Sequence, residues 1–237
     1  MKEQEQRLTI HYEHEMLVNP YPGILVALEG LDGSGSSTQA KNMERFYGMQ
    51  HGLDVWLTKE PTEGPIGATI RHILSRDLQM DNETLQMMFA TDRLDHLNEP
   101  RGIIARLENK SLVITDRYLW STIAYGHVEN IDINWLIAMQ SRFPLPDITV
   151  FLDASVDTCL ARIKGSRMGL DLFEKKAKLE KVLAGYKETI VRFPDQFIVI
   201  DGEQTPDVIS QQIKEEVEKH PKFSSLSTMN DNVSLNG

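Results

Sequence analysis

The sequence contains a single cysteine, has no long apolar run and carries no excess of positive charge. Because Cys159 has no possible partner within the chain, no intramolecular disulfide can form, and we expect a reducing compartment. No apolar run approaches the roughly 18 to 20 residues that span a bilayer, and residues 1–16 show no apolar core typical of a signal peptide. The formal net charge of −10 argues against a nucleic-acid or membrane-surface binder, since either needs a broad basic face. We therefore expect a cytoplasmic protein, and a local cluster of Arg and Lys would still be enough to hold a nucleotide.

The sequence does contain an alternation of apolar runs and helical patterns. Short continuous apolar runs, each ending in an acidic or polar residue, occur at 23–29, 54–58, 111–116, 148–153 and 197–201. Continuous runs are typical of strands that are buried on both faces of a parallel sheet. The stretches between them carry apolar residues at helical spacing. The pattern predicts a three-layer, doubly wound α/β domain with a parallel sheet of five strands.

Both ends of the chain differ in composition from this domain. Residues 1–20 are polar, and residues 221–237 are rich in Ser and Asn, a composition typical of disorder. We therefore predict an N-terminal extension at 1–20, a folded domain at 21–220 and a disordered tail at 221–237.

A glycine-rich loop follows the first predicted strand, where doubly wound sheets bind their ligands. The segment GLDGSGSST fits the phosphate-loop template G-x-x-x-x-G-K-[ST], except that Ser36 takes the lysine position. Its glycines would let backbone N–H groups converge on an anion at the start of a helix, and Ser37 would ligate Mg²⁺. A glycine-rich turn without a ligand is the alternative, but strand, loop and helix all fall where nucleotide binding needs them. The predicted ATP-binding residues are Gly30, Leu31, Asp32, Gly33, Ser34, Gly35, Ser36, Ser37 and Thr38.

In the order and spacing of further motifs, the chain resembles the thymidylate kinase family over about residues 23 to 215. The motifs are EGLDGSGSSTQ at 29–39, TKEP at 58–61, GATIR at 67–71, FATDR at 89–93 and DRY at 116–118. The resemblance implies a fold of the P-loop NTPase type and phosphoryl transfer from ATP to dTMP. It also implies Mg²⁺ as the cofactor and a homodimer as the assembly.

The resemblance implies roles for individual residues on the acceptor side. Asp32 would approach the sugar hydroxyl of dTMP, and Lys59 would reach its phosphate. Lys59 stands where the family has arginine, so it keeps the charge but loses the bidentate fork. Arg71 would lie near the thymine edge, Phe89 would stack on the base, and Arg93 would bind near it. Phe89 as plain helix core is the alternative.

The segment STIAYG at 121–126 is similar to the family's S-S-x-A-Y-Q, which lines the base pocket. This similarity assigns Thr122 and Tyr125 to substrate binding. Gly126 replaces the glutamine of the motif, and we expect looser base recognition for that reason.

Asp116 and Arg117 close the third predicted strand. Phosphoryl transfer needs a carboxylate to hold Mg²⁺ and cationic groups around the moving oxygens. We expect Asp116, with Ser37, to organise the metal and Arg117 to stabilise the transferred group; a surface ion pair is the alternative.

A cluster of basic residues lies where the chain resembles the family's lid, at about 162–172. The members of the cluster are Arg162, Lys164 and Arg167. Family members with glycine after the loop aspartate, as Gly33 is here, tend to supply a catalytic arginine from the lid, which implies Arg167. Either Arg167 or Lys164 would then replace the charge missing at Ser36. A solvated charge run is the alternative.

Three functions fit these patterns. Transfer of a phosphoryl group to dTMP is the leading one, because the acceptor-side motifs are largely recognisable. A catalytically weak or inactive nucleotide-binding protein is motivated by Ser36, since one lost preorganised charge can lower turnover by roughly 10² to 10³. A related nucleoside or nucleotide kinase is the third, although nucleoside kinases usually carry E-R-S where this chain has Asp116, Arg117 and Tyr118.

Overall fold

Five parallel strands form a central sheet in the order β2-β3-β1-β4-β5. The strands are β1 (Ile24–Gly30), β2 (Val55–Lys59), β3 (Leu112–Asp116), β4 (Ile148–Asp153) and β5 (Ile198–Asp201). Each neighbouring pair is parallel, so all five strands end at the same edge of the sheet. The computed structural model describes residues 15–163 and 170–228. The predicted five-stranded, doubly wound α/β fold is confirmed.

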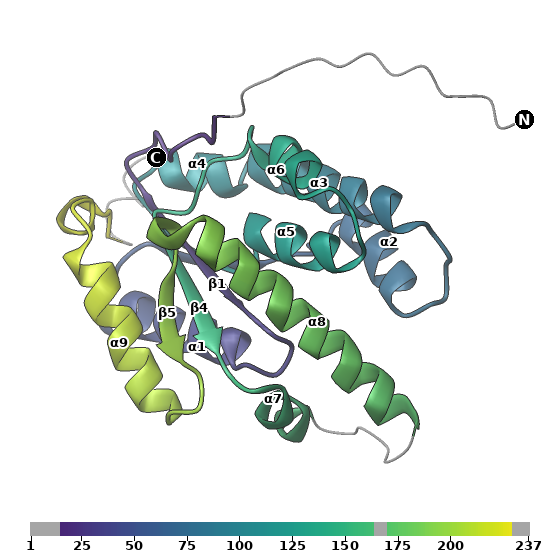
Figure 1. Ribbon diagram of the computed structural model, residues 1–237. Coiled ribbons are helices and arrows are strands. Elements are labelled where there is room, and N and C mark those ends of the chain that lie inside the picture. The colour runs from purple at the N-terminus through teal and green to yellow at the C-terminus, as the bar shows by residue number, and fades with distance from the viewer. Residues whose placement is uncertain (1–14, 164–169, 229–237) are drawn as a thin grey trace, which may run out of the picture.

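Helices cover both faces of the sheet (Figure 1). The first face carries α1 (Ser36–Glu44), its π-helical continuation η1 (Arg45–Gln50) and α9 (Pro206–Lys219). The second face carries α3 (Asn82–Asn98), α4 (Ile103–Glu108), α5 (Leu119–Val128), α6 (Ile133–Gln140) and α8 (Leu170–Arg192). Helix α2 (Pro65–Leu74) packs on α3, and α7 (Val156–Arg162) packs on α8. Short 3-10 turns occur at η2 (Pro194–Gln196) and η3 (Phe223–Ser225).

The strand β1 explains why the apolar runs are continuous. Val26 and Leu28 face the core beneath α1 and α9, whereas Leu25 and Ala27 face α3, α4 and α5. Every residue of β1 is buried. Because both faces are covered, both sets of side chains must be apolar, and the alternation typical of a half-exposed strand disappears.

Residues 221–228 pack on the domain, so the predicted disorder of 221–237 is wrong over this stretch. Phe223 and Leu226 join the core beneath α1 and α9. The backbone of Ser227 donates to the Lys110 carbonyl at 3.0 Å and accepts from the Asp54 N–H at 2.9 Å. The segment is held by these two apolar residues, by backbone hydrogen bonds and by the ion pair of Lys222 with Asp147. The average composition of the segment does not reveal such individual contacts.

Part of the predicted N-terminal extension is also in contact with the domain. The side-chain amide of Asn19 donates to the Gly23 carbonyl at 3.2 Å and to Asp147 at 2.5 Å. Across residues 15–163 and 170–228, no helix is long and apolar enough to cross a membrane.

We expect Cys159 to be unreactive in the native protein. It is fully buried on α7, and burial raises the pKa of its thiol to about 11. The reactive thiolate is therefore scarce at pH 8. DTNB should label no thiol in the native protein at this pH and one thiol after unfolding in urea. Rapid labelling without urea would contradict this burial.

Candidate active site

The loop between β1 and α1 depends on glycine at two positions. Gly33 and Gly35 have φ angles of +87° and +107°, which disfavour any residue with a Cβ atom. A Cβ on Gly33 would also lie 2.5 Å from the Cys159 carbonyl oxygen, so α7 can approach the loop only at a glycine. The first N–H groups of α1 have no acceptor within the helix. They face the loop together with the buried Ser34 Oγ, which has no partner in the described chain.

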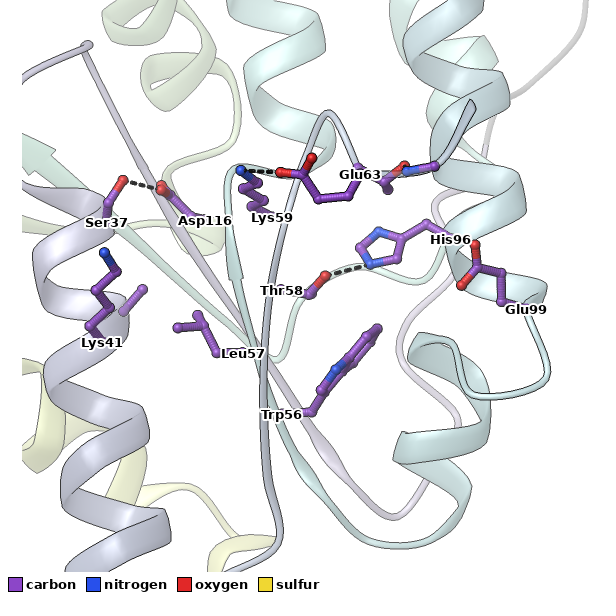
Figure 2. A pocket seen from close by; sticks show the side chains of 13 residues that line it. Ser37, Lys41, Trp56, Leu57, Thr58, Lys59, Glu63, His96, Glu99 and Asp116 are labelled. Atoms are coloured by element: carbon purple, nitrogen blue, oxygen red, sulfur yellow. Dashed lines mark hydrogen bonds and ion pairs between the residues drawn. The ribbon is translucent and has the colours of Figure 1, made fainter. Parts of the chain in front are cut away.

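Asp116 meets the start of α1 at the end of β3. It pairs in register with Leu28, whose side chain faces α1, and Asp116 therefore points to the same side. Ser37 Oγ donates to Asp116 Oδ2 (Figure 2). The other oxygen, Oδ1, is buried and has no hydrogen-bond partner among the residues described. This pair brings together the two residues that were predicted to hold a metal.

A hydroxyl beside an orphaned carboxylate oxygen suits Mg²⁺, which prefers oxygen ligands and keeps several waters. Within the described ranges, no group of three or more His, Cys, Asp and Glu side chains could hold a metal ion. Ser37 and Asp116 would therefore hold Mg²⁺ together with phosphate oxygens and water, not as a complete protein cage.

Arg117 joins the strand end to the phosphate loop. Its Nη2 donates to Asp32 Oδ1 at 2.6 Å, and its Nη1 lies 3.3 Å from both Ser121 Oγ and Tyr186 Oη. The guanidinium also lies over the Tyr125 ring, 5.3 Å from its centroid, which is within the roughly 6 Å of a cation–π contact. Arg117 has a φ of 73°, a conformation uncommon outside glycine that often marks functional positions. Two predicted catalytic residues, Asp32 and Arg117, are thus in direct contact.

Glu29 supports Arg117 from inside the protein. The fully buried carboxylate accepts the Tyr118 N–H at 3.0 Å, the Tyr186 hydroxyl at 2.8 Å and the Ser121 hydroxyl. Burial raises the pKa of Glu29, against the opposing effects of these donors and of Arg117. Glu29 therefore fixes the positions of Ser121 and Tyr186, because a buried carboxylate requires hydrogen-bond donors. Sequence reasoning missed this function, although a glutamate inside an apolar strand is a signal for it.

Arg162 holds the phosphate loop to the turn after β5. Its Nη1 donates to the Ser34 carbonyl at 3.1 Å, and its Nη2 donates to the Gly202 carbonyl at 3.0 Å. The sequence placed Arg162 in the lid, and the structure shows it bound to the loop backbone. Lys164 and Arg167 lie outside the described residues.

On the acceptor side, two predicted substrate-binding cations converge on one acid. Lys59 Nζ lies 2.6 Å from Glu63, and Arg71 Nη2 lies 3.2 Å from the same carboxylate. The hydrogen bond from Lys59 and the charges of both cations lower the pKa of Glu63. All three side chains are exposed enough for an acceptor phosphate to compete with Glu63 for the cations.

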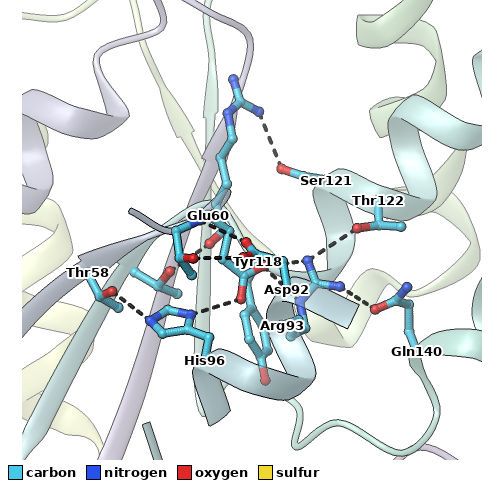
Figure 3. Close-up of polar contacts among 12 residues, drawn as sticks. Thr58, Glu60, Asp92, Arg93, His96, Tyr118, Ser121, Thr122 and Gln140 are labelled. Carbon is cyan, nitrogen blue, oxygen red and sulfur yellow. Dashed lines mark hydrogen bonds and ion pairs between the residues drawn. The ribbon is translucent and has the colours of Figure 1, made fainter. Parts of the chain in front are cut away.

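The structure places Arg93 in the interior, with its side chain only 1% exposed (Figure 3). Its Nε and Nη2 donate to Glu60 Oε2 at 2.8 and 2.5 Å, its Nη2 lies 3.2 Å from Thr122 Oγ1, and its Nη1 donates to Gln140. Thr122 is buried as well. These contacts engage the guanidinium with protein groups, and direct substrate contact by Arg93 or Thr122 stays a prediction.

The same buried network fixes the segment after β2. Glu60 Oε1 lies 3.2 Å from His96 Nδ1, and His96 Nε2 lies 2.7 Å from Thr58 Oγ1. Asp92 accepts from the N–H and hydroxyl of Thr62 at 2.8 and 2.7 Å. Helix α3 therefore holds both ends of the segment that carries Lys59. Sequence reasoning missed His96, whose partner is distant along the chain.

Comparison with known proteins identifies the family. Residues 28–213 match the family model described as thymidylate kinase. The chain belongs to the thymidylate kinase family. A protein of Pyrococcus horikoshii named "Probable thymidylate kinase" is 37% identical over 183 residues, which cover 75% of this chain and 87% of that protein. One of Methanocaldococcus jannaschii with the same name is 36% identical over 178 residues, which cover 75% and 86%.

The family assignment confirms the resemblance seen in the sequence. In this member of the thymidylate kinase family, Ser36 stands at the lysine position of the phosphate-loop template. Ser36 is the first residue of α1 and is 8% exposed. A serine hydroxyl is neutral, so a phosphate in this loop would meet backbone N–H groups and the helix N-terminus but no ammonium from position 36.

Proposed function

We propose that this protein transfers the γ-phosphoryl group of ATP to dTMP, giving ADP and dTDP, with Mg²⁺ as the cofactor. The observation that carries the proposal is the contact between Arg117 and Asp32 at 2.6 Å. It joins the phosphate loop to the strand end that faces the acceptor-side residues.

Phosphoryl transfer requires two nucleotides held in line and cations around the moving oxygens. Arg117 is the cation that we assign to the transferred group. Asp32 would exchange part of its contact with Arg117 for the sugar hydroxyl of dTMP. Ser37 and Asp116 would hold Mg²⁺, which supplies neutralising charge for the β- and γ-phosphate oxygens.

Lys59 and Arg71 would bind the acceptor when its phosphate displaces Glu63. Phe89 would stack on thymine, and Tyr125 would contribute to the same pocket. In support of this role, Phe89 is half-buried and belongs to none of the three hydrophobic clusters formed by the described residues. Arg167 and Lys164 keep their predicted role as lid cations.

The acceptor is tested by measuring ADP release with a panel of monophosphates. We expect dTMP to give the highest kcat/KM, dUMP a lower value and purine monophosphates the lowest. The highest value with AMP or dGMP would overturn the thymidylate assignment. ATP binding without turnover of any acceptor would favour the alternative of an inactive nucleotide-binding protein.

Phe89→Ala should weaken dTMP binding and leave ATP binding unchanged. Base–aromatic stacking contributes about 1 to 3 kcal/mol per base in nucleic-acid sites, which corresponds to a rise in Kd of roughly 5- to 150-fold. Calorimetric titration with each nucleotide measures both effects. Phe46→Ala is the matched control, because Phe46 packs against the core under α9 and should cost stability without changing dTMP affinity. Equal losses for both nucleotides in Phe89→Ala would identify Phe89 as core.

We further propose a cytoplasmic homodimer. Exposed apolar side chains occur on α2, on α3 and on the loop between them, an arrangement that often marks a protein interface. These residues are Leu74, Leu78, Met80, Met87 and Leu94. Sedimentation velocity should give the mass of a dimer, and Met87→Glu should shift it towards the monomer. A monomer at all concentrations of the parent protein would contradict this assembly.

A further inference from the structure

The charge missing at position 36 directs attention to the cations around the loop. Most of them are already engaged. Arg117 pairs with Asp32, and Arg162 donates to two backbone carbonyls. Lys59 pairs with Glu63 at 2.6 Å.

Lys41 differs from these cations, because within the described chain it makes no ion pair or side-chain hydrogen bond. It is exposed and lies one turn after Ser37 on the same face of α1. Helical side chains lean towards the N-terminus of their helix. The ammonium of Lys41 therefore extends back towards Ser37 at the start of α1, as Figure 2 shows.

Lys41 also shares a cavity with the predicted metal-binding residues. An open cavity of about 510 Å³ is lined by Ser37, Lys41, Lys59 and Asp116, among others. Lys59 pairs in register with Asp116, so both side chains leave the sheet on the α1 side. Nothing in the described residues satisfies Asp116 Oδ1, which is buried at this point. The same cavity is thus lined by a cation that is unpaired within the described residues and by an acid with one unsatisfied oxygen, which is a residue predicted to hold the metal.

We propose that Lys41, in addition to the predicted lid cations, supplies a charge that position 36 lacks, by contacting the β- or γ-phosphate oxygens of ATP from the Ser37–Asp116 side. The proposal rests on the proposed function only in that ATP is the donor nucleotide. Lys41 neutralises charge and transfers no proton.

A double-mutant cycle between positions 41 and 36 tests this proposal. Lys41→Ala should lower kcat/KM for ATP about 10²-fold, as expected for loss of a charge that stabilises the transferred group. In the Ser36→Lys background the same change should lower kcat/KM for ATP far less, because a lysine in the loop then contacts the phosphates. Lys187→Ala, which removes an exposed lysine from α8, is the control and should behave like the parent.

A second arm does not depend on the folding of Ser36→Lys. Lys41→Arg should keep most of the affinity for MgATP in calorimetric titration, whereas Lys41→Gln should lose it. If no acceptor is phosphorylated, the proposed function fails, and this binding arm still decides the role of Lys41.

Two results would overturn the proposal. One is an equal fold-loss for Lys41→Ala in the parent and in Ser36→Lys. The other is a lowered Tm with unchanged MgATP affinity, since Lys41 would then only stabilise the C-terminal end of α1 as a favourable charge on the helix dipole.

Discussion

Arg117→Ala should lower kcat by about 10²- to 10³-fold, the loss typical of one preorganised electrostatic group. The domain should stay folded, because the side chain is 19% exposed and, of its hydrogen-bond partners Asp32, Ser121 and Tyr186, only Tyr186 belongs to a core cluster. Single-turnover measurements of phosphoryl transfer, with circular dichroism on the same sample, separate the two effects.

Two further variants show how Arg117 acts. Arg117→Lys keeps the charge but loses the forked guanidinium that contacts both Asp32 and Tyr186. Its kcat should therefore lie between that of the parent and that of Arg117→Ala. Tyr186→Phe removes one hydroxyl that accepts a hydrogen bond from Arg117, but it leaves the charge of Arg117 in place. Its loss in kcat should therefore be smaller than that of Arg117→Ala. Near-normal turnover in a folded Arg117→Ala variant would exclude Arg117 from the mechanism.

Arg93→Ala should lower the free energy of unfolding by about 3 to 5 kcal/mol, as is common when one partner of a buried ion pair is removed. The Glu60 carboxylate would remain buried with His96 as its remaining side-chain partner. Urea denaturation followed by tryptophan fluorescence measures this loss.

A double variant of Glu60 and Arg93 is the control. Replacing Glu60 and Arg93 together by leucine should recover part of the stability, because no unpaired charge is then left inside. If Arg93→Ala unfolds like the parent and loses only dTMP affinity, Arg93 binds the substrate, as the sequence resemblance implies.

The sequence by itself determined the strands, the phosphate loop and the family. These features depend on local signals. An apolar run buried on both faces, a glycine at positive φ and a hydroxyl at the start of a helix are each encoded within a few neighbouring residues. Gly33, Gly35 and Ser37 could therefore be assigned before any contact was known.

Only the tertiary structure decided which charged groups face the cleft and which lie inside. Arg93 meets Glu60 from 33 residues away, and Tyr186 meets Glu29 from 157 residues away. Motif spacing places such residues near the site, but it does not predict which group each guanidinium or hydroxyl binds by a hydrogen bond. That choice follows from the packing of α3 and α8 on the sheet, because a buried polar group must find its partner among the elements that packing brings within hydrogen-bonding distance.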